Sequence, residues 1–431
     1  MPALSPRSLN EGSKLYSSIW SNQSMNAEVL PIYSLVQLKL ANYEQIYQLQ
    51  KRVKFCKAYL IIVLLSGLTV SCRKVNIDKN DLRDFQQVNL VSNNGDNAPT
   101  LTDPTLQNAW GIAWSPTGIA WINAEAAHVS HLYTGEGAIV RPAVNIPSPM
   151  DTIGGTPTGI VFAGGAGFKL ANGQPAAFLF AGDDGVLSGW NGPAGNNALR
   201  IANNSSSSSY FGPALATWNG SHFLYAADFK TGKIDVWDTT FTMVKMPFND
   251  PGLPASYSPF NIQSIGSWLF VMYAKVGPDG NEIHQVGLGL VDVFNPDGSF
   301  VKRFTTGGTL NSPWGVTMTP ANFLEETDMS NDGNGQKNDQ IANKHEAQDD
   351  NADQQPVILI GNFGDGHINV FSLAGQFLGQ LQNHNRTITI DGLWALSFAP
   401  STATAIDPMR LYFTAGPKDE TEGLFGYLFK K

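Results

Sequence analysis

The stretch Ser312-Pro-Trp-Gly-Val-Thr-Met318 decides the fold, because a turn with proline leads through a bulky residue into a short apolar strand. Variants of this pattern recur elsewhere as Asn108-Ala-Trp-Gly-Ile-Ala-Trp114, Thr156-Pro-Thr-Gly-Ile-Val-Phe162, Gly212-Pro-Ala-Leu-Ala-Thr-Trp218, Ser258-Pro-Phe-Asn-Ile-Gln263 and Asp391-Gly-Leu-Trp-Ala-Leu-Ser-Phe398. Between the residues that correspond to Trp314, the intervals are 48, 56, 46, 54 and 80 residues. This spacing indicates one structural unit that is repeated six times.

The longest interval contains an insert, residues 324–355, which is rich in Asn, Asp and Gln. We expect a disordered loop there, because the insert cannot bury enough apolar surface to order itself. Without its 32 residues the interval becomes 48, and units of about 50 residues are typical of four-stranded propeller blades. The sequence therefore predicts an all-β, six-bladed β-propeller, with a seven-bladed ring as the alternative.

The last unit contains only three strands and ends with Gly423-Leu-Phe-Gly-Tyr-Leu-Phe429. The strand Phe85-Gln-Gln-Val-Asn-Leu-Val-Ser92 precedes the first unit and belongs to none. We predict that this N-terminal strand completes the last blade as its outer strand, with Val88 near Tyr427, because closure removes two exposed sheet edges. Residues 85–430 then form a single propeller.

Composition excludes several classes of function. Only 15% of the residues are charged, while 43 Gly and 25 Pro favour short strands joined by turns. The net charge is −9, of which residues 1–71 contribute +4 (seven basic, three acidic side chains), so the remainder carries −13. This acidic balance argues against nucleic-acid binding. The two cysteines, Cys56 and Cys72, leave the repeats without a disulfide or a catalytic thiol.

A leader precedes the repeats. Four basic side chains in residues 51–57 are followed by the apolar run 58–70, which is too short to span a bilayer comfortably. The small residue Ser71 stands immediately before Cys72, as a lipoprotein signal peptidase requires. An uncleaved anchor and a conventionally cleaved signal are the alternatives.

We therefore predict a lipoprotein signal peptide over residues 51–71, a lipidated Cys72 and a polar tether over residues 72–84. The protein is expected to be exported and held at the outer membrane or cell surface by its lipid. Residues 1–50 carry no clear pattern. We interpret them as a non-native or disordered extension that arises from a gene start placed too early.

In a propeller, loops open around the central tunnel, and polar residues there are candidates for a ligand site. The residues predicted to lie at this tunnel mouth are Asn108, Asn123, Asp183, Asp228, Asn261, Asn362 and Asp391. Carboxylate and amide oxygens suit Ca²⁺, which takes about six to eight of them. Capping of tight turns by the same side chains is the ordinary alternative.

The insert holds a weaker calcium pattern. Asp328, Ser330 and Asp332 supply oxygens at positions 1, 3 and 5 of an EF-hand-like loop, and Asp339 stands at position 12. Flanking helices are not evident in the sequence, and position 12 lacks the usual Glu. No nucleophile elbow, phosphate loop or zinc motif accompanies the pattern.

Trp110, Trp314 and Trp394 occupy the same place in their units. We expect them to pack around the inner ring. A platform for stacking carbohydrate at the tunnel mouth is the alternative.

From Asn89 onward the chain resembles an uncharacterised family of secreted bacterial β-propellers, some of which end in a PEP-CTERM sorting signal. The segments that carry this resemblance are Asn89-Leu-Val-Ser92, Asp103-Pro-Thr-Leu-Gln-Asn-Ala-Trp-Gly-Ile-Ala113, Ser258-Pro-Phe-Asn-Ile-Gln263, Gly287-Leu-Gly-Leu-Val-Asp-Val-Phe294, Leu310-Asn-Ser-Pro-Trp-Gly-Val316, Gly361-Asn-Phe-Gly-Asp-Gly-His-Ile-Asn-Val-Phe371, Ile390-Asp-Gly-Leu-Trp-Ala-Leu396 and Leu411-Tyr-Phe-Thr-Ala-Gly-Pro-Lys-Asp-Glu420. The resemblance implies export and a propeller, and it assigns no activity. The chain departs from it by the insert and by ending at Lys431 without a sorting segment.

The first functional hypothesis is a monomeric binding or scaffold module, displayed on the envelope, with a protein or carbohydrate ligand and without catalysis. The second is a calcium-dependent hydrolase or lactonase with its site at the tunnel mouth. Fold alone does not choose between them.

Overall fold

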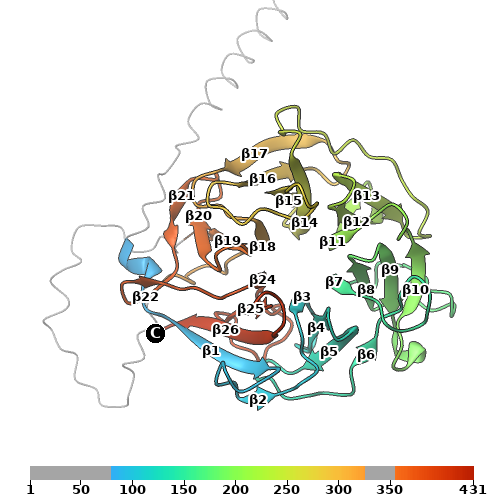
Figure 1. Cartoon of the computed structure of the whole chain (residues 1–431), viewed down its shortest axis with the longest axis horizontal. Helices are drawn as coiled ribbons and strands as arrows, with labels where there is room; N and C mark the ends of the chain where they lie inside the picture. The colour runs from blue at the N-terminus through green and yellow to red at the C-terminus, as the bar shows by residue number, and fades with distance from the viewer. Residues whose placement is uncertain (1–78, 326–354) are drawn as a thin grey trace, which may run out of the picture. The chain divides into compact units, whose positions relative to one another are not determined.

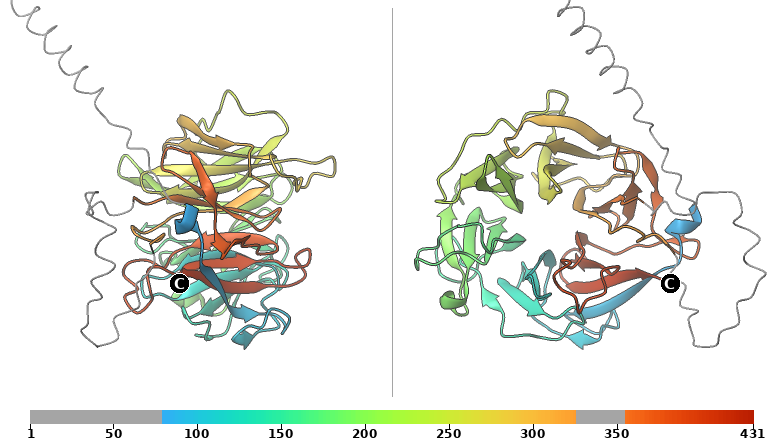
Figure 2. Two further views of the ribbon diagram at one scale, coloured as in Figure 1. Left: turned by 90° about the vertical axis from the view of Figure 1, so that its left-hand side faces the viewer. Right: turned by 180° about the vertical axis from the view of Figure 1, so that it is seen from behind.

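The computed structural model of the protein describes residues 79–325 and 355–431. Within these residues six β-sheets surround a central axis (Figure 1), and the same ring is seen from behind in Figure 2. In each sheet the strands lie further outward in chain order, except that the outermost strands of one sheet come from the start of the described chain. The predicted all-β, six-bladed propeller is confirmed.

The strands have the following bounds. Blade 1 contains β3 (Ala109–Trp114), β4 (Ala120–Ala124), β5 (Val129–Tyr133) and β6 (Val144–Asn145), and blade 2 contains β7 (Pro157–Phe162), β8 (Phe178–Gly182), β9 (Val186–Trp190) and β10 (Leu199–Asn203). Blade 3 contains β11 (Tyr210–Trp218), β12 (Ser221–Asp228) and β13 (Lys233–Asp238), and blade 4 contains β14 (Tyr257–Ile265), β15 (Trp268–Lys275), β16 (Gly289–Phe294) and β17 (Phe300–Thr306). Blade 5 contains β18 (Pro313–Met318), β19 (Ile358–Asn362), β20 (Ile368–Phe371) and β21 (Phe377–Gln380). Blade 6 contains β24 (Leu393–Ser397), β25 (Leu411–Ala415), β26 (Leu424–Lys430), β1 (Phe85–Ser92) and β2 (Leu101–Thr102), while β22 (Gln382–Asn383) and β23 (Arg386–Thr387) form a separate hairpin.

The glycine in the repeated pattern has a steric reason. A Cβ atom on Gly111 of β3 would lie 2.5 Å from the carbonyl oxygen of Thr158 in β7. A Cβ on Gly315 of β18 would lie 2.6 Å from the carbonyl oxygen of Trp394 in β24. Neighbouring inner strands therefore approach so closely at this level that only glycine fits.

The ring closes as predicted. β1 pairs with β26 in antiparallel register, and Val88 lies opposite Tyr427. The ladder shifts by a bulge between Asn89 and Val91, and the short β2 adds to β1 in parallel beyond that point. Blade 6 is thus built from both ends of the folded chain.

Blade 3 differs from the expected four strands, because the described residues give it only three. After β13 one bridge joins Trp237 to Met243, and the amide of Val244 donates to the carbonyl of Val236 at 2.8 Å. The chain beyond contains Pro247 and Pro251. Proline has no amide proton to donate, so this segment cannot form a continuous outer ladder.

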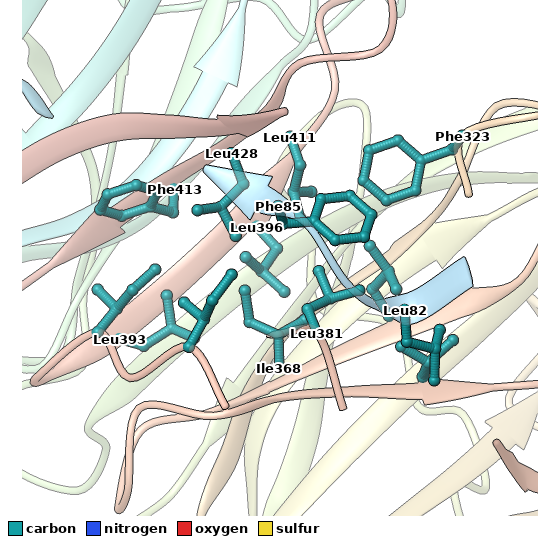
Figure 3. Close-up of a cluster of buried hydrophobic side chains, with 14 of the residues drawn as sticks. Leu82, Phe85, Phe323, Ile368, Leu381, Leu393, Leu396, Leu411, Phe413 and Leu428 are labelled. Carbon is teal, nitrogen blue, oxygen red and sulfur yellow. The ribbon is translucent and has the colours of Figure 1, made fainter. Parts of the chain in front are cut away.

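A buried apolar cluster surrounds the point of closure. Figure 3 shows Leu82 and Phe85 beside Leu381 and Phe323, and all four are at most 3% exposed. Leu82 ends a short 3-10 helix, Lys79–Leu82, so the last residues of the predicted tether pack against the propeller. Leu324, the first residue of the predicted insert, is also buried.

Several predictions fall outside the described residues. They are the extension 1–50, the signal peptide 51–71, lipidated Cys72 and the calcium pattern of Asp328, Ser330, Asp332 and Asp339. In residues 79–325 and 355–431, no helix has the length and apolar character needed to cross a bilayer.

Candidate functional site

Aromatic side chains from four blades meet at the centre of the ring. Trp110 stacks on Trp394 with ring centroids 3.7 Å apart, and Phe363 stacks on the same Trp394 at 3.8 Å. Trp314 and Phe260 contact Trp394 edge-on and tilted, respectively. The three tryptophans are only 4%, 4% and 1% exposed (Trp110, Trp314 and Trp394). This burial supports packing as their role and leaves little ring surface for carbohydrate.

A small cavity of about 20 Å³ lies among the inner strands and is lined by Gly111, Gly159, Asn261 and Trp314, among others. This volume has room for about one water molecule. Because this cavity is too small for a larger ligand, the loops at the tunnel mouth are the candidate site.

Four carboxylates from four blades gather at those loops, and we call them the acidic loop cluster: Glu125, Asp183, Glu282 and Glu420. Each follows the second strand of its blade, in the β4–β5, β8–β9, β15–β16 and β25–β26 connections. The charges of the other three carboxylates all raise the pKa of Glu420. The four side chains thus form one electrostatic group.

Asn108 joins this cluster to the aromatic rings. Its Nδ2 donates to Oε2 of Glu125 at 3.1 Å and to Oε2 of Glu420 at 3.0 Å. Its Oδ1 accepts a hydrogen bond from Nε1 of Trp394 at 2.9 Å. A Cβ on Gly416 would lie 2.3 Å from that same Oδ1, so the glycine leaves room for the amide.

Two carboxyl groups of the cluster titrate near neutral pH. Burial, followed by repulsion from Glu282 and Glu125, raises the pKa of Glu420 to about 7, although Asn108 favours the charged form. Burial is also the main reason that the pKa of Asp183 rises to about 7; a hydrogen bond to Thr156 opposes the rise, and Glu125 and Asp184 add to it. Perturbations of this kind are frequent at functional sites.

The cluster has little compensation by cations. His284 lies 3.2 Å from Oε1 of Glu282, a hydrogen bond that raises the pKa of the imidazole. Within the described part of the chain, this is the one ion pair made by the four carboxylates. Lys418, on the same turn as Glu420, pairs instead with Asp96 and Glu422 at 2.7 and 2.6 Å.

The turn that carries Glu420 is strained. Lys418, Asp419 and Glu420 have successive φ angles of 54°, 52° and 66°, in the left-handed region that residues other than glycine seldom adopt. Each such residue costs about 1 kcal/mol or more. The surrounding contacts hold this turn in place and direct Glu420 towards Asn108.

Of the seven predicted mouth residues, the structure brings Asn108 and Asp183 into the cluster. Asp228 caps a turn, since its carboxylate accepts from the amides of Ser209 and Thr231. Asp391 is exposed and accepts from the amide of Lys418.

The three remaining asparagines link segments of neighbouring blades. The Nδ2 group of Asn123 donates to the carbonyls of Thr158 and Gly159, that of Asn261 to Trp314, and that of Asn362 to Thr309 and Asp365. All three asparagines are at most 1% exposed. These five residues outside the cluster therefore have structural partners.

Sequence reasoning missed Glu125, Glu282, Glu420 and His284. The available signal was their position in the loop after the second strand of a blade, where Asp183 also lies. Glu420 also ends one of the segments that carried the resemblance.

Among residues 79–325 and 355–431, no three His, Asp or Glu side chains lie close enough to hold one metal ion. We derive no step through a metal.

Comparison with known proteins gives relatives of unassigned activity. The chain is 29% identical over 362 residues to the uncharacterized protein L690 of Acanthamoeba polyphaga mimivirus, covering 80% of this chain and 86% of the relative. It is 27% identical over 356 residues to the uncharacterized protein R648 of the same virus, covering 80% of each. No family model matches the chain. These relatives are viral, whereas the resemblance predicted a bacterial family.

Two solved structures resemble the chain distantly. A gluconolactonase from Xanthomonas campestris has a TM-score of 0.42 and 11% identity, over 75% of this chain and 86% of that one. Streptogramin B lyase has a TM-score of 0.41 and 12% identity, over 80% and 97%. At these scores the likeness carries no argument about the site.

Proposed function

We propose that the protein is a binding module whose loop face takes up a positively charged group of a partner. The observation that carries this proposal is the acidic loop cluster, in which four blades place carboxylates together with His284 as their one paired cation among the described residues. Assembling these groups raises two pKa values to about 7. A bound cation relieves the same repulsion.

One feature besides the carboxylates favours a basic protein segment over a metal ion. Apolar side chains project from loops on this face, namely Met150, which is 92% exposed, and Val286, which is 57% exposed. A basic segment of a protein partner would meet both chemistries.

Binding of a fluorescent hexalysine peptide to the full-length chain tests this proposal. We expect affinity to fall with added salt, and Glu420→Gln and Glu282→Gln to weaken binding several-fold. Glu136→Gln is the matched control, because Glu136 is an exposed carboxylate in a β5–β6 turn, away from the cluster. Equal effects of Glu420→Gln and Glu136→Gln would show nonspecific attraction and refute the site.

We further propose that this module is exported and anchored through Cys72, as the leader sequence and the resemblance to secreted propellers support, and that it acts as a monomer. In a bacterial host that processes lipoproteins, the wild type should take up labelled palmitate and Cys72→Ser should not. Equal labelling of the two chains would contradict lipidation at Cys72.

A hydrolase remains the second proposal, because Asp183 and Glu420 have pKa values of about 7 that suit general acid–base catalysis. A calcium-dependent enzyme should melt at a higher temperature with calcium than with EDTA, since a metal at 100 times its Kd adds about 2.7 kcal/mol. Identical melting temperatures would count against it.

A further inference from the structure

A pocket of about 650 Å³ lies away from the acidic loop cluster, at the seam where the ring closes. It is lined by Phe85 and Gln87 of β1 and by residues 383–389, which include the turn of the β22–β23 hairpin. Sites for small molecules usually measure about 300 to 1,000 Å³. Neither function proposed above uses this pocket.

The pocket has an apolar base and polar walls. Phe85 and Ile388 belong to the buried cluster of Figure 3 and are 0% and 7% exposed, so they offer no open aromatic face. The walls carry amides at 87, 383 and 385, an imidazole at 384 and hydroxyls at 387 and 389. Amides and hydroxyls both donate and accept hydrogen bonds, as a ligand rich in hydroxyl groups requires.

The charge of the lining is unlike that of the rest of the protein. Arg386 lines the pocket and no Asp or Glu does, in a chain whose net charge is −9. Its side chain is exposed, and within residues 79–325 and 355–431 its guanidinium has no ion pair or side-chain hydrogen bond. A guanidinium binds a carboxylate through two parallel hydrogen bonds. The lining therefore combines neutral hydrogen-bonding groups with one unpaired guanidinium and one imidazole, that of His384, whose Nδ1 lies 2.6 Å from Oδ1 of Asn383.

We propose that this pocket binds a small sugar acid, with its carboxylate on Arg386 and its hydroxyls on the amide and hydroxyl side chains of the walls. One guanidinium balances one carboxylate. A phosphate carries about −1.5 to −2 at neutral pH and would draw on both Arg386 and His384. We assign the sugar carboxylate because it needs Arg386 alone, and galactose 6-phosphate is the competitor that tests this choice.

Titrations of the full-length chain, followed by ligand NMR signals, test the assignment with three matched sugars: galacturonate, galactose and galactose 6-phosphate. We expect galacturonate to bind at least tenfold more tightly than the other two. Arg386→Gln should weaken galacturonate binding about tenfold or more, because a charge-assisted pair is lost. Thr389→Val should weaken it less, while Lys245→Gln, an exposed cation on blade 3, should leave it unchanged.

Four results would overturn the proposal: no binding of galacturonate, equal binding of galactose, tighter binding of the phosphate, or full affinity in Arg386→Gln. Arg386 is exposed, so its replacement should leave the melting temperature of the protein unchanged. A loss of binding can then be assigned to the pocket. The loop face is a separate site, and the hexalysine titration of Arg386→Gln should match that of the wild type.

Discussion

Individual side chains determine the pKa values in the acidic loop cluster. Asn108 has no exposed surface, and it shares its amide between two carboxylates while its oxygen accepts from Trp394. Hydrogen-bond donors favour the charged form of a carboxylate, and burial disfavours it. At Glu420 the effects of burial and of repulsion by neighbouring carboxylates are larger than the effect of the Asn108 hydrogen bond, so the pKa rises to about 7.

The free energy of unfolding should consequently fall as pH rises from 5 to 8. Glu420 and Asp183 have raised pKa values in the folded state, so the folded protein binds more protons than the unfolded chain in this range, and its advantage is lost as pH passes 7. In Glu420→Gln the decline should be shallower, as measured by denaturant unfolding at each pH. Asp419→Asn, on the same turn but exposed, should keep the wild-type decline. Parallel curves for Glu420→Gln and the wild type would contradict the assignment.

A second group of interacting charged side chains includes two residues of blade 4. Arg303 on β17 donates to Asp292 on β16 and to Asp250 in the segment that replaces an outer strand of blade 3. The side chains of Asp292 and Asp250 are only 0% and 5% exposed. Burial raises the pKa of Asp292 to about 7 in spite of the opposing charge of Arg303.

Arg303→Met should therefore lower the free energy of unfolding by about 3 to 5 kcal/mol at pH 8, because two buried carboxylates lose their partner. The loss should be smaller at pH 5, where Asp292 is protonated. Lys302→Met, one residue away, should change stability by less than about 1 kcal/mol. A loss that is equal at both pH values would point to packing and not charge.

At the scale of elements, the close approach of strands explains which part of the sequence was informative. Gly111 and Gly315 stand in the repeated pattern because the neighbouring inner strand leaves no room for a Cβ. Because this close approach recurs from blade to blade, the pattern recurs at regular intervals in the sequence. Such regular intervals can be recognised from the sequence alone. Blade 3 lost its outer strand where prolines interrupt the ladder, and its apolar pattern gave no warning of this.

The closing ladder can be tested by one methyl group. A Cβ on Gly426 of β26 would lie 2.3 Å from the carbonyl oxygen of Val88 and 2.8 Å from the ring of Phe413. We expect Gly426→Ala to destabilise the protein by about 1 to 3 kcal/mol, measured by denaturant unfolding. Gly192→Ala, with nothing within 4 Å of the added methyl, is the control and should be near neutral. If Gly426→Ala leaves the free energy of unfolding unchanged, β1 can move away from the added methyl group at no energetic cost.

At the scale of the whole molecule, the candidate site exists only because the ring brings distant loops together. Glu125 and Glu420 are 295 positions apart in the chain, yet both bond Asn108. Loop carboxylates look like ordinary solvated residues in a sequence, since no periodic packing demand marks them. Fold and closure could be predicted from repeats, whereas the membership of the site depended on which turns face the axis.

Because an N-terminal strand and a C-terminal strand pair to close the ring, the two ends of the propeller segment lie side by side. The amide of Lys431 donates to the carbonyl of Asp84 at 3.1 Å. A short linker between these residues would make the propeller covalently circular, and new ends could then be opened at an exposed turn such as Asn219–Gly220. The point at which synthesis of the ring begins can thereby be moved, while the cyclic order of the six blades around the axis stays the same.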